Sequence, residues 1–260
     1  MMSLQNRPQQ LSGSKIFLII LLIILLTFVS FSLLKPEKPA SNKKFIFSGN
    51  GIYVYETENG GKSLRCLTFS PKEALNGLNQ GCIFKKYPKK LVFDYTKFMI
   101  KATMLAEKKE SILMLGMGIG TIPQALSENL PNAKIDIVEI IPEMPKIAAE
   151  FFYFKKTDNM NIFIEDAYSF VLNAALQSKA KYDIILMDIF DETYIPHQFL
   201  TEEFMLKLKH LLKPEGKLIV NTFSNSPNYE MEEELIGKFY KFQSEMKTIN
   251  RIMIVSENPH

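Results

Sequence analysis

Short apolar runs alternate with segments of helical period across the chain after Asp94. Strands that are apolar on both faces and separated by helices are typical of a parallel sheet covered on both sides. The pattern predicts an α/β fold whose ligands bind at the carboxyl ends of the strands. The predicted strands are 112–115, 135–140, 162–164, 182–187, 217–223 and two within 246–255; the predicted helices are 95–107, 121–130, 143–154, 167–177, 201–212 and 228–242.

The chain before Asp94 has a different, β-type pattern. Apolar and β-branched runs at 52–55 and 64–69 flank the sequence ENGGK at 58–62, which favours a tight hairpin turn. We therefore predict a small antiparallel β subdomain over residues 45–93, followed by the α/β domain over residues 94–260.

Residues 16–34 form an unusually apolar block of 19 uncharged positions, 16 of which are Ile, Leu, Phe or Val. A helix of this length spans about 28 Å, close to the ~30 Å hydrocarbon core of a bilayer. A cleaved signal peptide is the alternative, but its apolar region is usually about 7–15 residues. We expect a retained transmembrane helix, preceded by a tail (1–15) and followed by a linker (35–44).

The charges beside this block predict its orientation. Basic residues stay in the cytoplasm, so a bias toward the carboxy-terminal side places the body of the protein there. Cys66 and Cys82 are the only cysteines, and we expect them to be reduced and unpaired, in keeping with that compartment. The prediction is a single-pass protein of the inner (cytoplasmic) membrane with its catalytic domain in the cytoplasm. The flanking basic residues are Arg7 and Lys15 before the block, and Lys35, Lys38, Lys43 and Lys44 after it.

The overall composition excludes two kinds of partner. The 31 basic and 28 acidic residues leave a net charge of +3, which is no electrostatic footprint for nucleic acid. Three histidines and two cysteines without a CxxC spacing do not make a zinc site, so we expect no metal.

Glycines follow the first predicted strand of the α/β domain, at Gly116, Gly118 and Gly120. Glycine lets the backbone approach a ligand where a Cβ atom would clash, and the following helix offers free N–H groups. A tight turn without a ligand explains the same pattern, so the loop alone leaves both interpretations open.

Acidic residues stand at the ends of the next three strands. Glu139 is placed to accept hydrogen bonds from both hydroxyls of a ribose, with a solvated helix cap as the alternative. Asp166 suits an adenine amino group and also the N-cap of the next helix. Asp188 and Asp191 form a pair that would orient a cationic amine and accept its proton, although an Asx-turn or a cap explains Asp191 equally.

Together these signatures resemble the polyamine aminopropyltransferase (spermidine synthase) family, on the class I S-adenosylmethionine methyltransferase-like fold. The resemblance covers roughly residues 44–255, including a β-rich subdomain that a plain methyltransferase would lack. It is closest to a divergent bacterial branch, some of which carries membrane segments. It implies a Rossmann-like, seven-stranded methyltransferase-type sheet after a small antiparallel β subdomain. The stretches that carry it are LVFDYTKFMIKA, ILMLGMGIGTIPQAL, IDIVEIIPEM, FIEDAYSFV and YDIILMDIFDETYIPHQFLTEEF.

The resemblance implies a transferase of polyamine and spermidine biosynthesis. An aminopropyl group would pass from decarboxylated S-adenosylmethionine, a co-substrate rather than a permanently bound cofactor, to putrescine or a related amine, leaving methylthioadenosine. Asp188 would be the catalytic proton acceptor, and Asp191 and Tyr95 would bind the amine. Members of the family are often dimers or tetramers, so the resemblance also implies a homodimer as an assembly open to this chain. The residues implied to hold the adenosyl donor are Gln80, Gly116, Gly118, Gly120, Glu139, Asp166 and Ala167.

Three positions depart from the family pattern. Ile119 stands where the glycine loop of the family carries an Asp that binds the aminopropyl amine, and Thr96 and Lys97 replace a His-Glu pair. Lys97, if it faced the pocket, would repel a cationic substrate. Two other functions therefore stay open: a methyltransferase that uses ordinary S-adenosylmethionine, and a catalytically silent, membrane-tethered nucleoside-binding or interaction module.

Overall fold

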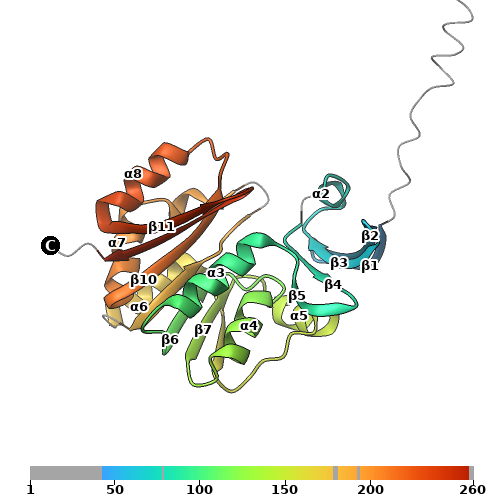
Figure 1. The fold of residues 1–260 in the computed structure, drawn as a ribbon, viewed down its shortest axis with the longest axis horizontal. Coiled ribbons are helices and arrows are strands. Elements are labelled where there is room, and N and C mark those ends of the chain that lie inside the picture. Colours follow the sequence, from blue (N-terminus) through green and yellow to red (C-terminus); the bar gives the residue numbers. More distant parts are fainter. Residues whose placement is uncertain (1–42, 78, 178–180, 192–193, 258–260) are drawn as a thin grey trace, which may run out of the picture. The chain divides into compact units, whose positions relative to one another are not determined.

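The computed structural model describes residues 43–77, 79–177, 181–191 and 194–257. Within these ranges the strands form a five-stranded sheet and a seven-stranded sheet (Figure 1). The predicted combination of a small antiparallel sheet and an α/β sheet is therefore confirmed.

The five-stranded sheet has its strands in chain order, each antiparallel to the next. Gly60 and Gly61 make the tight turn that the sequence predicts within residues 58–62. Their φ angles are 55° and 72°, in a region that favours glycine. The elements are β1 (Lys44–Gly49), β2 (Ile52–Asn59), β3 (Lys62–Thr68), α2 (Pro71–Leu75), β4 (Gly81–Phe84) and β5 (Tyr87–Leu91).

The cysteines correct the prediction that they are unpaired. Cys66 on β3 lies directly opposite Cys82 on β4, with the two Cα atoms 4.1 Å apart, and they form a disulfide. Sixteen residues separate them in the sequence, and only the register of β3 against β4 brings them together. These cysteines therefore do not support a reducing compartment.

The seven-stranded sheet has the order β11-β12-β10-β9-β6-β7-β8. Its strands are β6 (Ser111–Leu115), β7 (Lys134–Glu139), β8 (Met160–Ile164), β9 (Tyr182–Met187), β10 (Leu212–Phe223), β11 (Tyr240–Lys247) and β12 (Asn250–Glu257). The helices between and before them are α3 (Asp94–Leu105), α4 (Thr121–Asn129), α5 (Met144–Phe152), α6 (Ala167–Gln177), α7 (Glu202–Leu211) and α8 (Tyr229–Phe239), with a short 3₁₀ turn, η1 (His197–Phe199).

The direction of one strand differs from the predicted parallel sheet. Strands β6 to β10 pair in parallel, whereas β12 runs antiparallel to both β10 and β11. Only Thr248 and Ile249 separate β11 from β12. A parallel connection needs about a dozen residues or more, so these two strands can only form a hairpin.

The boundary between α8 and β11 also differs from the prediction. The helix ends at Phe239 rather than at residue 242, and the strand begins at Tyr240. The buried Tyr240 side chain donates a hydrogen bond from its hydroxyl to the carbonyl oxygen of Met205 at 3.0 Å. Tyr240 also pairs with Glu257 of β12, so contacts with distant segments mark the end of α8, and helical spacing alone does not reveal them.

The strand order positions a ligand site. Strand β6 lies between β7 and β9, so the chain reverses direction across the sheet at β6. The carboxyl ends of β6, β7 and β9 meet at one edge, which is the usual place for a ligand in such a sheet. The strands there are anchored by a core in which Leu113, Leu115 and Met187 are fully buried.

Within the described ranges, no helix has the length and hydrophobicity needed to cross a bilayer. The predicted membrane helix over residues 16–34, together with the tail 1–15 and residues 35–42 of the linker, lies outside these ranges.

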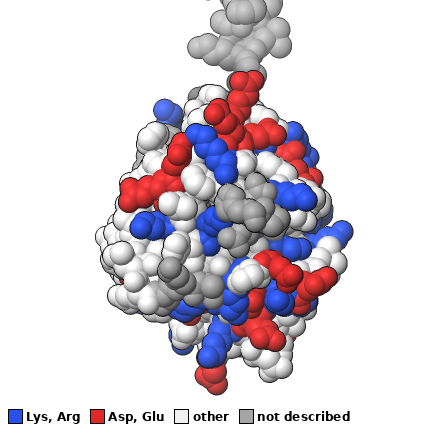
Figure 2. Space-filling view, turned by 90° about the vertical axis from the view of Figure 1, so that its left-hand side faces the viewer, with Lys and Arg blue, Asp and Glu red and all other residues white. Residues whose placement is uncertain are grey.

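Charged side chains of both signs are interspersed on the face of the molecule where α8 and β11 lie (Figure 2). Several of them pair across elements on this part of the chain, such as Lys238 on α8 with Glu202 on α7 at 2.5 Å. A face with both signs mixed is a solvated surface rather than a basic stripe.

Candidate active site

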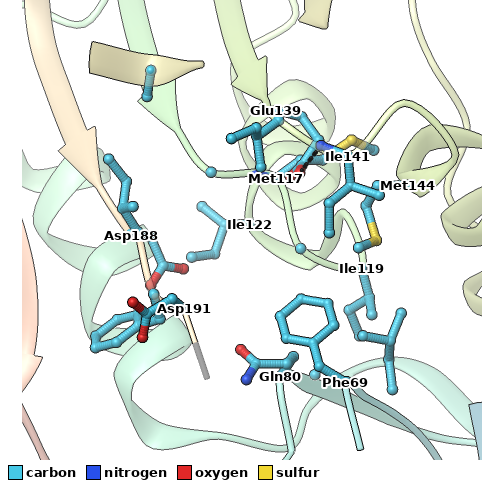
Figure 3. Close-up of a pocket in the computed structure, with 18 of the residues that line it drawn as sticks. Phe69, Gln80, Met117, Ile119, Ile122, Glu139, Ile141, Met144, Asp188 and Asp191 are labelled. Carbon is cyan, nitrogen blue, oxygen red and sulfur yellow. Dashed lines mark hydrogen bonds between the residues drawn. The ribbon is translucent and has the colours of Figure 1, made fainter. Parts of the chain in front are cut away.

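A cavity of about 480 Å³ lies where the carboxyl ends of β6, β7 and β9 face residues of the five-stranded sheet (Figure 3). Its lining combines apolar side chains with a small set of acids, three amides and a tyrosine. This combination is typical of small-molecule sites. The predicted site residues that line it are Gln80, Tyr95, Gly116, Gly118, Glu139, Asp166, Ala167, Asp188 and Asp191.

The glycine loop brings two strand ends into contact. Gly116 has φ of 90°, and a Cβ atom there would lie 2.2 Å from the carbonyl oxygen of Asp188. Gly118 also has a positive φ, but a Cβ atom there would meet nothing within 4 Å. Gly120 does not line the cavity; it precedes α4, and a Cβ atom would lie 2.5 Å from the Phe154 ring. Its role is close packing, whereas the first two glycines form the cavity wall.

Glu139, the last residue of β7, is buried at the cavity wall. Its two carboxylate oxygens accept hydrogen bonds from the backbone N–H groups of Met117 at 3.0 Å and Ile141 at 2.9 Å. Burial raises the pKa of the carboxyl group, and the backbone donors oppose that rise. The backbone thus holds the carboxylate at the cavity wall, where its oxygens can serve as acceptors for the hydroxyls of a vicinal diol.

Asp166 serves the helix that follows it and also faces the cavity. Its Oδ2 atom accepts hydrogen bonds from the backbone N–H and the hydroxyl of Ser169, both at 3.2 Å, at the start of α6. The two predicted roles of Asp166 are therefore compatible, because Oδ1 has only a long 3.4 Å contact with the N–H of Tyr168. Ala167, the first residue of α6, completes this part of the lining.

Asp188 directly follows β9. Its Oδ1 atom accepts a hydrogen bond from Nδ2 of Asn221 at 2.8 Å. Burial raises the pKa of Asp188 to about 6, and the Asn221 hydrogen bond opposes this rise. Below this pKa the group is protonated, and at neutral pH it is mainly a carboxylate that can take up a proton.

Tyr95, on α3, lies near Asp188 in the same wall. Burial and the charge of Asp188 raise the pKa of its hydroxyl well above the ordinary range. The hydroxyl therefore stays protonated and acts as a hydrogen-bond donor or acceptor. The ring stacks on Phe93, with centroids 5.9 Å apart, which fixes its direction.

Asp191 and Asp188 lie at the same end of the cavity, and Gln80 lies across from them (Figure 3). Asp191 accepts a hydrogen bond on Oδ1 from the backbone N–H of Tyr194 at 2.9 Å. The backbone N–H of Gln80 donates to the carbonyl oxygen of Leu67 at 2.9 Å, so the five-stranded sheet holds the main chain of Gln80 at the cavity. Two carboxylates at one end of a cavity suit a cationic or neutral amine.

The surroundings of the three residues that depart from the family pattern show what each of them does. Ile119 lines the cavity and packs in an apolar cluster, so no acid stands at that point of the wall. Thr96 is buried, lines the cavity and donates its hydroxyl to the carbonyl oxygen of Phe93 at 2.8 Å. Lys97 is exposed and pairs with Asp94 at 2.7 Å, away from the lining. The repulsion considered for Lys97 therefore does not arise.

Sequence reasoning missed the residue that holds Asp188. Asn221 is buried on β10 and holds Asp188. A polar residue directly after the apolar run at 218–220 is the signal that would have drawn attention to it. Within the described residues, no group of three or more His, Cys, Asp or Glu side chains could hold a metal ion.

The sheet order and the acids at successive strand ends define the class of transferases with a methyltransferase-like fold, whose substrates bind at this edge. The chain belongs to the spermine/spermidine synthase family, whose domain matches residues 92–253. It is a transferase.

Individual relatives show the extent of the similarity. A polyamine aminopropyltransferase of Vibrio vulnificus is 35% identical over 208 residues, which cover 78% of this chain and 67% of the relative. The human eEF1A lysine and N-terminal methyltransferase is 31% identical over 126 residues, 45% of this chain and 18% of that protein. A solved probable spermidine synthase from Corynebacterium glutamicum has a TM-score of 0.62 at 20% identity, covering 84% of this chain and 81% of that one. At that identity the structural likeness shows the fold alone.

Proposed function

We propose that this protein transfers the aminopropyl group of decarboxylated S-adenosylmethionine to putrescine or a related amine, with release of methylthioadenosine. The observation that carries the proposal is that Asp188, Asp191 and Tyr95 line the same cavity as Glu139 and Asp166. An acid with a pKa of about 6 at that position is suited to accept a proton from an attacking amine at neutral pH.

The chemistry needs a neutral nitrogen aligned with the carbon that bears the leaving group. The nitrogen lone pair attacks the methylene carbon bound to the sulfonium, a C–N bond forms, and the C–S bond breaks with its electron pair moving to sulfur. The sulfonium becomes a neutral thioether, and the proton released by the nitrogen passes to Asp188. Asp191 and Tyr95 orient the amine, which supplies much of the rate by proximity.

The donor is held by groups at the neighbouring strand ends. Glu139 accepts from the ribose hydroxyls and Asp166 from the adenine amino group. The Gly116 and Gly118 backbone forms the wall against which the nucleoside lies, and Gln80 closes the opposite side. This division of roles rests on which residues line the cavity and on their hydrogen-bonding capacity.

The test is turnover of decarboxylated S-adenosylmethionine with putrescine by the full chain. Asp188→Asn should lower kcat by at least about a hundredfold, because general-base catalysis contributes about that much or more. Asp158→Asn, the same change at an exposed position outside the cavity, is the control and should leave kcat unchanged. Equal kcat in Asp188→Asn and wild type would remove Asp188 from this role.

Methyl transfer is the second candidate, and Ile119 is the observation that favours it. An apolar side chain at this point of the wall gives the ammonium group of a decarboxylated donor no partner, which weakens the demand for that donor. Calorimetry with both donors separates the two functions: tighter binding of ordinary S-adenosylmethionine would favour methyl transfer. Failure of both donors and of methylthioadenosine to bind would leave an interaction module.

The proposal also includes an anchor at residues 16–34 with the body on the cytoplasmic side, since more basic residues follow the block than precede it. Disulfides are rare in the cytoplasm. The Cys66–Cys82 disulfide is an observation against this side of the membrane, and alkylation in intact cells tests it: labelling of both thiols would support a cytoplasmic body. Protection of both thiols from alkylation in cells would place the body in an oxidising compartment.

A further inference from the structure

One glutamate of α8 is in an environment that its neighbours do not share. Glu232 is 0% exposed, whereas Glu230, Glu233 and Glu234 on the same helix are exposed. Burying a carboxyl group is costly unless hydrogen bonds compensate for the lost water. The partners of Glu232 therefore indicate what it is for.

Two hydroxyl groups converge on the same oxygen of Glu232. The Tyr194 hydroxyl donates to Oε1 at 2.6 Å, and the Ser226 hydroxyl donates to the same atom at 2.7 Å. In the described part of the chain, Oε2 accepts no hydrogen bond. The carboxyl group thus joins Ser226, close to α8, to Tyr194, which lies 38 residues away in the sequence.

Tyr194 in turn holds Asp191. Its backbone N–H donates to Oδ1 of Asp191 at 2.9 Å, and its carbonyl oxygen accepts from the Asp191 N–H at 2.9 Å. The Tyr194 ring packs against Phe223 and Phe190, with centroids 5.5 and 6.2 Å away. The hydroxyl is therefore held by Glu232 of α8 and the ring by Phe190 and Phe223, while the backbone of the same residue is bonded to the acid at the cavity.

We propose that Glu232 is a positioning residue for the amine substrate: through Tyr194 it holds the Asp191 carboxylate at the cavity. The inference rests on the proposed function, in which Asp191 binds the amine. Glu232 does not line the cavity, so it acts only through Tyr194. Asp188 is held separately by Asn221, so this relay governs amine binding and not the proton acceptor.

The experiment compares Tyr194→Phe and Glu232→Gln, alone and combined, with wild type. Tyr168→Phe is the matched control, because this tyrosine stacks on Phe204 outside the cavity lining. Each single change should raise KM for putrescine about tenfold, the size expected for one lost hydrogen bond to a charged group. In these variants kcat and the dissociation constant of methylthioadenosine should stay within about twofold of the wild-type values. The same two quantities should stay within about twofold in Tyr168→Phe.

Because Glu232 and Tyr194 act in series, the double variant should lose no more than the worse single variant. An unchanged KM in Tyr194→Phe, or losses that multiply in the double variant, would overturn the relay. Hydrogen–deuterium exchange separates this inference from the proposed function. If wild type transfers no aminopropyl group, the proposed function fails, and faster exchange at the amide of residue 194 in Glu232→Gln still supports the relay. Unchanged exchange at that amide would overturn it.

Discussion

Replacing Asn221 by leucine should move the pH dependence of the reaction toward alkaline pH. The Asn221 amide donates the 2.8 Å hydrogen bond that favours the charged form of Asp188. The side chain is 1% exposed, and leucine has a similar volume, so the change removes the donor with little disturbance of packing. Without the donor, only burial acts on the carboxyl group, and burial favours the protonated form.

The size of the shift follows from the strength of the lost bond. A hydrogen bond to a charged group contributes about 1.5–3 kcal/mol, and one pKa unit corresponds to about 1.36 kcal/mol. The pKa of Asp188 should therefore rise from about 6 by about 1–2 units in Asn221→Leu. Because the carboxylate is the active form, activity at neutral pH falls and is regained at higher pH.

The assay is the dependence of kcat/KM on pH, whose acid limb reports the free enzyme. Asn161→Leu is the control, because Asn161 also donates to a carboxylate, that of Asp136 at 2.9 Å, but outside the cavity. Asn250→Ala provides a second variant, since Asn250 donates to Oδ1 of Asn221 at 3.0 Å and so fixes which way its amide points. Its shift should have the same sign and be smaller. An acid limb in Asn221→Leu identical to wild type would refute the reasoning.

Three further predictions concern the cavity wall and the small sheet. Gly116→Ala should lower the free energy of unfolding in urea by at least about 2 kcal/mol, because a positive φ and a Cβ atom 2.2 Å from the Asp188 carbonyl oxygen act together. In the control Gly118→Ala the new Cβ atom meets nothing within 4 Å, so the free energy of unfolding should fall by only about 1 kcal/mol. Equal losses in the two variants would contradict the clash at Gly116. Ile119→Asp should tighten binding of decarboxylated S-adenosylmethionine, measured by calorimetry, at least about tenfold relative to the carboxylated donor, because it supplies a partner for the ammonium group. An unchanged ratio of the two dissociation constants would place the ammonium group elsewhere. Reduction of the Cys66–Cys82 disulfide should cost about 3 kcal/mol in the same urea measurement, as expected for a loop of this length; equal stability of both forms would show that the register of β3 against β4 is sufficient.

Local pattern was enough to predict most elements and the position of the site. The apolar strands of the α/β domain have a period that distinguishes them from the helices, and Gly60 and Gly61 define a turn by backbone conformation alone. Glu139, Asp166 and Asp188 come together because parallel strands place their carboxyl ends at one edge.

The features that sequence reasoning missed depend on contacts between distant segments. The Cys66–Cys82 disulfide needs the register of two strands, and α8 ends where Tyr240 contacts Met205 and pairs with Glu257. The hold of Asn221 on Asp188 spans 33 residues and two adjacent strands. None of these has a local period or spacing, so only the tertiary structure reveals it.

The central claim is that acids at neighbouring strand ends hold an adenosyl nucleoside beside Asp188. A crystal structure of the full chain with methylthioadenosine tests it most directly. The account predicts ribose hydroxyls on Glu139, the adenine amino group on Asp166 and the thioether sulfur on the Asp188 side of the cavity. A nucleoside bound elsewhere, or one whose ribose turns away from Glu139, would contradict it.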